Sequence, residues 1–129
     1  MPVSAAERAV LDKIDEDHLV ELTRSLVRAG GQNPPGEEAA TVAVLADAAA
    51  GLGLDVCAVP VQPGRDNLRV TLSGGSGPGL LVLGHTDVVP VGEGWTKDPF
   101  GGVVADGRIH GRGTSDMKGG LAAALSASW

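Results

Sequence analysis

Apolar residues in the first part of the chain recur at helical spacing and predict three helices. The first begins after Ser4, which together with the glutamate three residues later has the spacing of a capping box. The second is expected over residues 19–29, where the paired glycines that follow end it. The third begins at Glu37, has acidic residues in its first turn, and ends at the glycine at position 51 or 53.

The period then changes to that of extended chain, and three segments are predicted to be strands: residues 55–59, 68–72 and 80–83. The last of these is an unbroken apolar run, which is typical of a strand buried on both faces. The glycine-rich residues 74–79 match no phosphate-binding motif and precede a strand, so we expect a hairpin loop there.

Residues 103–110 predict a second hairpin, with Asp106 and Gly107 in its tight turn. A last helix is expected from Ser115 to the chain end at Trp129. Helices followed by strands and a further helix predict an α/β fold with a mixed sheet flanked by helices. The length of 129 residues suits one domain or part of one.

Composition narrows the class of protein. The net charge is −6 and aromatic residues make up 2% of the chain, so the sequence favours neither phosphate attraction nor base stacking, and no nucleic-acid partner is expected. No apolar run approaches the roughly 20 residues that cross a bilayer, and no membrane partner is expected. The N-terminus lacks the apolar core of a signal peptide, which predicts a cytoplasmic protein. Cys57, the single cysteine, excludes a cysteine-based zinc cluster and is expected to be a small buried strand residue.

His85 and Asp87 follow closely after the apolar run 80–83. Because alternate residues of a strand point to the same face, we expect both side chains to project together at the carboxyl end of the strand, where ligands gather in α/β sheets. A histidine that binds a metal usually donates its other ring N–H to a carboxylate, and the His-x-Asp spacing supplies one. A histidine that is merely hydrogen-bonded at a strand end is the alternative interpretation.

Asp116 lies in the glycine-rich run GRGTSDMKGG, residues 111–120, where the last helix is predicted to start. In one interpretation Ser115 or Asp116 is the N-cap of that helix. In the other, Asp116 is a carboxylate displayed at a strand-to-helix turn that faces the same site as His85. The local pattern leaves both interpretations open.

Four runs, in matching order and separation, resemble the zinc-dependent M20 amidohydrolases and peptidases, the family of acetylornithine deacetylase, succinyl-diaminopimelate desuccinylase, aminoacylase and carboxypeptidase G. The runs are NPPG at 33–36, GHTDVVP at 84–90 with Trp95, DPF at 98–100, and GRG through DMKGG at 111–120. The resemblance extends from about Asp17 to the end of the chain. It is closest to the branch of acetylornithine deacetylase and desuccinylase.

The resemblance implies roles for three residues. His85 is expected to bind one zinc ion, Asp116 to bridge two zinc ions, and Asp87 to serve catalysis by orienting and polarising His85. Two such metals lower the pKa of a bridging water and polarise the scissile amide carbonyl, so the expected reaction is hydrolysis of an N-acyl amino acid or small peptide. Sites of this donor type also accept cobalt or manganese. The resemblance further implies a cis peptide bond between Asp116 and Met117.

By the same resemblance the chain is incomplete, since the family's adjacent glutamate pair, a further acidic ligand and a late histidine have no counterpart in it. The acidic pair Glu37-Glu38 is interpreted as helix N-terminal charge, His18 as a surface residue and His110 as part of a structural hairpin. A catalytic zinc normally takes three protein ligands and a water. Residues 1–129 are therefore interpreted as the N-terminal part of a zinc-aminopeptidase-like catalytic domain that is inactive alone, with the rest of that domain and a dimerisation domain absent.

The partners that this implies are a small N-acyl amino acid or peptide substrate and, for the full-length form, a second copy in a homodimer. Deacylation is favoured over dipeptide or folate-type carboxypeptidase action. Two other interpretations remain: a non-catalytic truncated homologue or association partner, and a plain α/β binding domain without metal. The last requires His85 and Asp116 to lie far apart, so a separation within about 4 to 6 Å argues against it.

Overall fold

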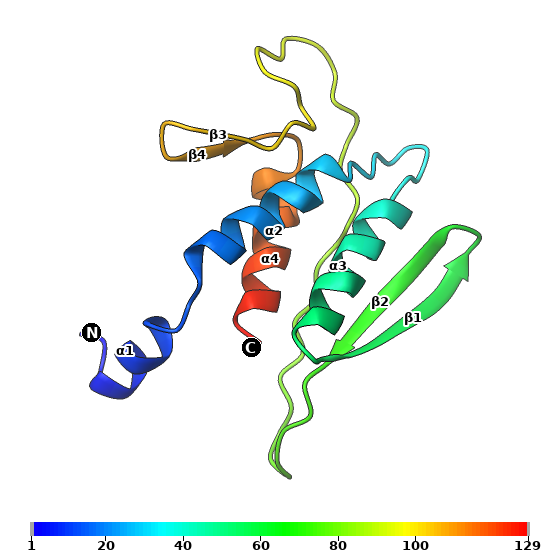
Figure 1. Ribbon diagram of the computed structural model, residues 1–129. Coiled ribbons are helices and arrows are strands. Elements are labelled where there is room, and N and C mark those ends of the chain that lie inside the picture. The colour runs from blue at the N-terminus through cyan, green and yellow to red at the C-terminus, as the bar shows by residue number, and fades with distance from the viewer. Residues whose placement is uncertain (1, 129) are drawn as a thin grey trace.

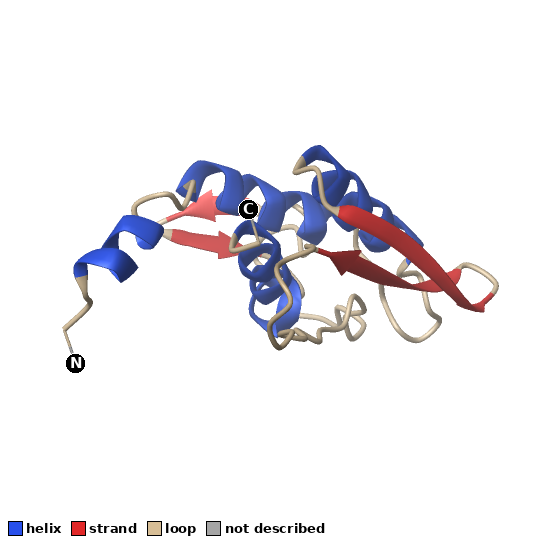
Figure 2. Ribbon diagram, turned by 90° about the horizontal axis from the view of Figure 1, so that it is seen from below, coloured by secondary structure: helices blue, strands red, loops and turns tan. Residues whose placement is uncertain are grey.

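The computed structural model describes residues 2–128, in which the helices other than the first pack together and two separate hairpins lie on opposite sides of them (Figures 1 and 2). The helices are α1 (Ala5–Leu11), α2 (Glu16–Arg28), α3 (Ala39–Gly51) and α4 (Gly119–Ser126), with the kinked turn η1 (Thr114–Lys118) before α4. The strands are β1 (Asp55–Gln62), β2 (Arg65–Thr71), β3 (Val103–Ala105) and β4 (Arg108–His110). The predicted helix end at Trp129 lies outside the described residues.

The three predicted N-terminal helices are confirmed as α1, α2 and α3. The capping box at the start of α1 is complete, because Ser4 N–H donates to Oε2 of Glu7 at 2.7 Å and Glu7 N–H donates to Oγ of Ser4 at 3.3 Å. α1 buries no residue. Its helical start is therefore encoded locally, whereas α2 and α3 each bury an apolar stripe.

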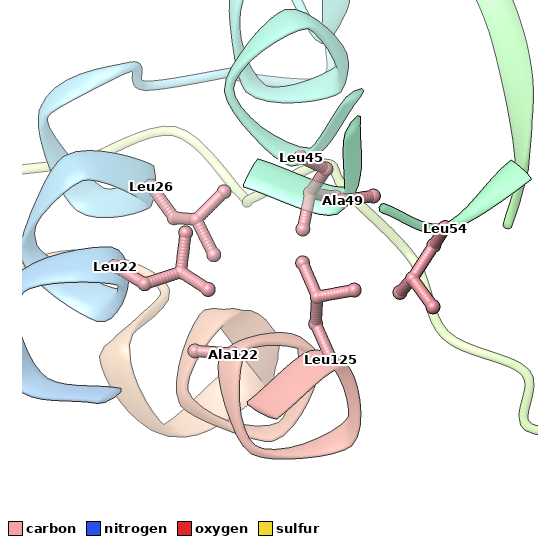
Figure 3. Packing of buried hydrophobic residues seen from close by; sticks show 7 residues of the cluster. All are labelled: Leu22, Leu26, Leu45, Ala49, Leu54, Ala122 and Leu125. Atoms are coloured by element: carbon pink, nitrogen blue, oxygen red, sulfur yellow. The ribbon is translucent and has the colours of Figure 1, made fainter. Parts of the chain in front are cut away.

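The core lies where α2, α3 and α4 meet (Figure 3). Apolar side chains from the three helices, and one from the short connection between α3 and β1, point toward one another there. They are Leu22, Leu26, Leu45, Ala49, Leu54, Ala122 and Leu125. Leu26 and Ala49 are both 0% exposed. α4 directly follows η1, the turn that carries Asp116.

Among residues 2–128 the strands form two antiparallel hairpins, and no sheet joins the two. β1 pairs with β2 from Asp55 opposite Thr71 to Gln62 opposite Arg65, and this hairpin packs on α3 (Figure 1). β3 pairs with β4 as predicted, and Asp106 (φ +52°) and Gly107 (φ +70°) have the positive φ angles of the tight turn. Residues 2–128 form a mixed α/β structure, as predicted, but their strands form two separate two-stranded sheets and not the mixed sheet flanked by helices that was expected.

The apolar run 80–83 is extended chain with no strand partner among residues 2–128, so its prediction as a buried strand is wrong. Leu80 is 91% exposed and Leu83 is 80% exposed. The physical reason is that a strand requires a neighbour whose N–H and C=O groups pair with its own, and no described segment runs beside this one in that way. Residues 74–79 therefore connect β2 to an unpaired segment, and they are not the hairpin loop that was expected.

Two smaller predictions also fail. Cys57 is exposed, because β1 belongs to a two-stranded hairpin with a helix on one side only. The last helix begins at Gly119 and not at Ser115, because Asp116 and Met117 have non-helical angles inside η1. Within residues 2–128 no helix has both the length and the apolar character that crossing a bilayer requires.

Candidate metal centre

The segment 85–88 is held by a short parallel pairing with the loop that follows α2. Val88 N–H donates to the carbonyl of Gly31 at 2.9 Å, and Asn33 N–H donates to the carbonyl of Val88 at 2.9 Å. Val88 is 3% exposed, so its buried side chain anchors the segment in the protein interior. The pairing that positions His85 therefore comes after the histidine and not, as the sequence predicted, from a buried strand before it.

The turn η1 places Asp116. Gly113 precedes the turn with φ +84°, and Lys118 N–H donates to the carbonyl of Gly113 at 2.8 Å. Within the turn Asp116 has φ −130° and ψ 93°, and the peptide bond from Asp116 to Met117 is cis, which confirms that prediction. Since α4 begins only at Gly119, the interpretation of Asp116 as its N-cap is wrong.

The two segments meet through the side chains of His85 and Asp116. Nε2 of His85 lies 2.8 Å from Oδ1 of Asp116. The other ring nitrogen, Nδ1, lies 3.1 Å from the carbonyl oxygen of Asp87 and 3.2 Å from its Oδ1. The backbone N–H of His85 donates to Sδ of Met117 at 3.3 Å. The structure thus brings all three predicted site residues together, and the separation argues against a plain binding domain with His85 and Asp116 far apart.

Hydrogen bonds set the charge of these groups. The bond to Asp116 raises the pKa of the His85 imidazole above its usual value, with further support from Asp87, while partial burial opposes the rise. Nδ2 of Asn33 donates to Oδ2 of Asp87 at 3.1 Å, and this bond lowers the pKa of the Asp87 carboxyl. Asp87 is therefore an ionised acceptor beside Nδ1, which favours a proton on that nitrogen.

The pair faces a shallow cleft of about 260 Å³. One side is lined by residues 111–116, and the other by His85, Asp87, Val88 and Val89. The Asp116 side chain is 86% exposed and that of His85 is 46% exposed. Both donor atoms are therefore within reach of an ion or small molecule from solvent.

The donor set fits a divalent metal in part. Two ligands of one tetrahedral ion, each with a bond of about 2 Å, have donor atoms about 3.3 Å apart, so Nε2 and Oδ1 at 2.8 Å need to separate only slightly. Asp87 beside Nδ1 is the outer carboxylate that a metal-binding histidine usually has. Across residues 2–128, no three or more His, Cys, Asp or Glu side chains converge as a metal cluster would require. A zinc site built on His85 and Asp116 would therefore need at least one more protein ligand.

The other candidate residues lie away from this pair. His18 is exposed on α2, as expected, and His110 lies on β4. Glu38 is the N-cap residue of α3, as its interpretation as helix N-terminal charge implies, but it is also 6% exposed and accepts from Nε of Arg65 at 3.0 Å. This partly buried ion pair links the start of α3 to β2 and gives Glu38 a structural role.

Sequence reasoning missed Asn33 as the partner of Asp87. The only signal for it was its place in the run NPPG, which belongs to the resemblance but says nothing about contacts. It also missed Lys118, which is 1% exposed beneath the turn that carries Asp116. Its position within a glycine-rich run gave no indication of burial.

A mixed α/β chain that displays a histidine, a carboxylate and an outer carboxylate at one cleft has the features of a metal-dependent hydrolase. Residues 81–128, which include His85, Asp87 and Asp116, match the model of peptidase family M20/M25/M40. These residues therefore belong to this peptidase family.

The chain is similar in sequence to curated relatives over most of its length. The chain is 44% identical over 117 residues to succinyl-diaminopimelate desuccinylase of Methylobacterium radiotolerans, covering 87% of this chain and 29% of that protein. It is 46% identical over 110 residues to the enzyme of the same name from Gluconacetobacter diazotrophicus, covering 82% of this chain and 28% of the relative. The chain thus spans less than a third of the length of these curated relatives.

Proposed function

We propose that the full-length protein carrying this chain is a two-zinc amidohydrolase, and that residues 1–129 form the N-terminal part of its catalytic domain. The observation that carries the proposal is the 2.8 Å approach of His85 Nε2 to Asp116 Oδ1, with Asp87 at the other ring nitrogen. The family is typically zinc-dependent, which supports the choice of metal. Cobalt or manganese suits the same nitrogen and oxygen donors.

Each residue has a distinct task in the proposed site. His85 offers the lone pair of Nε2, and Asp116 offers two carboxylate oxygens, which suits a ligand that bridges two ions. Asp87 accepts from Nδ1–H, so that Nε2 is the nitrogen that faces a metal, while Asn33 keeps Asp87 oriented and ionised. Bound metal ions supply the Lewis acidity that activates a water and polarises the amide carbonyl.

The proposed substrate is the amide bond of an N-acyl amino acid. Because the relatives above are named for desuccinylation of succinyl-diaminopimelate, that compound is the first to test, and N-acetylornithine the second. The cleft at His85 is open and about 260 Å³, which suits a small polar substrate better than a folded protein. The proposal is completed by a homodimer, as the resemblance implies, and by a cytoplasmic location, as the N-terminal sequence predicts.

The test uses the full-length protein with three variants: His85→Ala, Asp116→Ala and the control His18→Ala. Zinc content is measured by elemental analysis after removal of free metal, and amine release from succinyl-diaminopimelate is measured in parallel. We expect His85→Ala and Asp116→Ala to lose both zinc and hydrolysis. His18→Ala changes an exposed histidine of α2 and is expected to keep both.

Two results would contradict the proposal. Undiminished zinc content and hydrolysis in His85→Ala and Asp116→Ala would remove these residues from the site. A wild-type protein that holds no zinc and hydrolyses neither substrate would favour the other interpretation, a non-catalytic homologue or association partner.

A further inference from the structure

Lys118 is the most deeply buried charged side chain among residues 2–128, at 1% exposure. It lies two residues after Asp116, at the end of η1, and its side chain runs away from the cleft into the helices. Within the same residues no carboxylate lies at ion-pair distance from it, whereas the other buried charge, Glu38, is paired with Arg65. A buried cation without a carboxylate partner is costly unless all its donors are satisfied.

The ammonium group of Lys118 is satisfied by oxygen atoms. Nζ donates to the carbonyl of Leu26 at 2.7 Å, to the carbonyl of Gly30 at 2.6 Å and to Oγ1 of Thr41 at 2.9 Å. A protonated lysine has three donors, and all three are used. Burial lowers the pKa of Lys118 to about 8, which leaves the side chain mainly protonated at pH 7.

Two of these acceptors lie at the carboxyl end of α2. Leu26 is in the last turn of the helix and Gly30 is two residues beyond its end. The last carbonyls of a helix lack intrahelical donors and carry the negative end of its dipole, so a cation is favoured there. Thr41 in the first turn of α3 also donates to the carbonyl of Gly30, at 3.1 Å. Lys118 thus joins α2, α3 and η1 at one point.

The loop at Gly30, to which Lys118 donates, is also bonded to the segment that carries His85. The carbonyl of Gly31, directly after Gly30, accepts from Val88 N–H, and Asn33, two residues further along, bonds both Val88 and Asp87. The loop that Lys118 holds is therefore the loop that fixes the segment carrying His85. On the opposite side, Lys118 ends the turn that carries Asp116.

The aliphatic stem of Lys118 strengthens this link. A Cβ atom placed at Gly113 would lie 3.1 Å from Cδ and Cε of Lys118 and 2.5 Å from Cγ1 of Val88. The lysine stem and the Val88 side chain thus close on the same backbone position from the two halves of the site.

From these contacts we propose that Lys118 is a positioning residue that sets the distance between His85 and Asp116. It acts by tying the turn that carries Asp116 to the loop that holds the His85 segment, and it touches neither metal nor substrate. The inference rests on the proposed function for its catalytic meaning, but the positioning itself is a property of the metal-free protein.

The experiment compares Lys118→Met with Leu125→Ala in the full-length protein. Methionine keeps an unbranched apolar stem and removes all three donors. Leu125→Ala removes packing from the core on α4, in the buried cluster and not among the cleft residues, so it controls for general loss of stability. Readouts are the His85 ring signals in long-range ¹H–¹⁵N spectra of the metal-free protein, Co²⁺ affinity from absorbance titration, and kcat and KM.

We expect Lys118→Met to change the His85 ring signals and to weaken Co²⁺ binding about 10- to 100-fold, the range for residues that support metal ligands indirectly. kcat falls while KM stays close to wild type, because Lys118 does not contact substrate. Leu125→Ala is expected to lower the melting temperature and to leave the His85 signals and Co²⁺ affinity unchanged.

Wild-type ring signals and Co²⁺ affinity in Lys118→Met would overturn the proposal, and so would equal changes in Leu125→Ala. If the wild-type protein binds no Co²⁺, the proposed function fails, yet the His85 signals of the metal-free variants still decide the positioning role. If Lys118→Met does not fold, Thr41→Val takes its place, since it removes one acceptor of Nζ. A smaller change in the same direction is expected there, and unchanged His85 signals would overturn the proposal.

Discussion

Replacing Gly113 with alanine tests whether the two halves of the candidate metal centre close on this backbone position. Gly113 has φ +84°, a left-handed conformation that costs an L-residue with a Cβ about 1–2 kcal/mol. The new methyl group would also lie 2.5 Å from Cγ1 of Val88, and overpacking of this kind costs about 1–3 kcal/mol. Together these effects predict a loss of roughly 2–5 kcal/mol in the free energy of unfolding.

Two other glycines separate the contributions. Gly53 also has positive φ, +75°, but a Cβ there meets nothing within 4 Å, so Gly53→Ala is expected to cost only the conformational part, about 1–2 kcal/mol. Gly51 ends α3 with no positive φ and open space around its Cβ position, so Gly51→Ala is expected to stabilise by about 0.5–1 kcal/mol. The three positions thus differ in backbone angle and in available space.

The assay is urea denaturation followed by far-ultraviolet circular dichroism, with all three variants in the same polypeptide and compared with wild type. The excess loss in Gly113→Ala over Gly53→Ala measures the overlap with Val88. A loss in Gly113→Ala no larger than that in Gly53→Ala would refute the close approach of the two halves at this position.

Three further outcomes follow from the same structure. Leu26→Ala, at a side chain that is 0% exposed, is expected to cost about 2–5 kcal/mol in urea denaturation, and a loss below about 1 kcal/mol would contradict its place in the core. The raised pKa of His85 means that its contribution to stability is fully present below the unfolded pKa of about 6.5 and is lost as pH rises through the higher folded value. NMR titration of the metal-free protein checks this: Asp116→Asn is expected to lower the His85 pKa, and an unchanged value would exclude their hydrogen bond. Amides of residues 80–83 in the 129-residue chain are expected to exchange within the dead time of hydrogen-exchange mass spectrometry, whereas protection equal to that of α2 would show a pairing absent from the structure.

The helices were predictable because their signals are local. The capping box at Ser4 and the apolar stripe of α2 depend on residues three or four apart, and both are found in the structure. The hairpin at Asp106 and Gly107 was predictable for the same reason, since its turn demands positive φ at adjacent residues.

The strands were harder because pairing is not local. The run 80–83 is apolar enough for a buried strand, but the pattern reports composition and not the presence of a partner. The dipeptide Pro63-Gly64 is a local signal for the turn between β1 and β2 that the sequence analysis did not use. Gly64 has φ +74° in the structure. Taking 74–79 as the loop of a hairpin followed from missing that earlier turn.

The sequence predicted which residues form the candidate site, but it did not predict the residues that hold them in place. Spacing placed His85 beside Asp87, and the family resemblance added Asp116. The contact of Asn33 with Asp87 joins residues 54 apart, and that of Lys118 with Leu26 joins residues 92 apart. No periodicity reports contacts of that separation, because they depend on how the helices pack around the core.

The residues that orient the proposed site and the residues that would bind its metal are not equally represented in residues 2–128, and this difference bears on how the site assembles. Residues 2–128 contain the groups that orient His85 and Asp116: Asp87, Asn33, Met117 and, as proposed, Lys118. Of the proposed metal donors, the same residues bring only His85 and Asp116 together, one fewer than a catalytic zinc takes from its protein. If His85 and Asp116 are oriented before the remaining ligands bind, those ligands and the metal complete a site whose geometry is already set by hydrogen bonds. The ring orientation of His85 in the metal-free protein would then already be that of the complete centre.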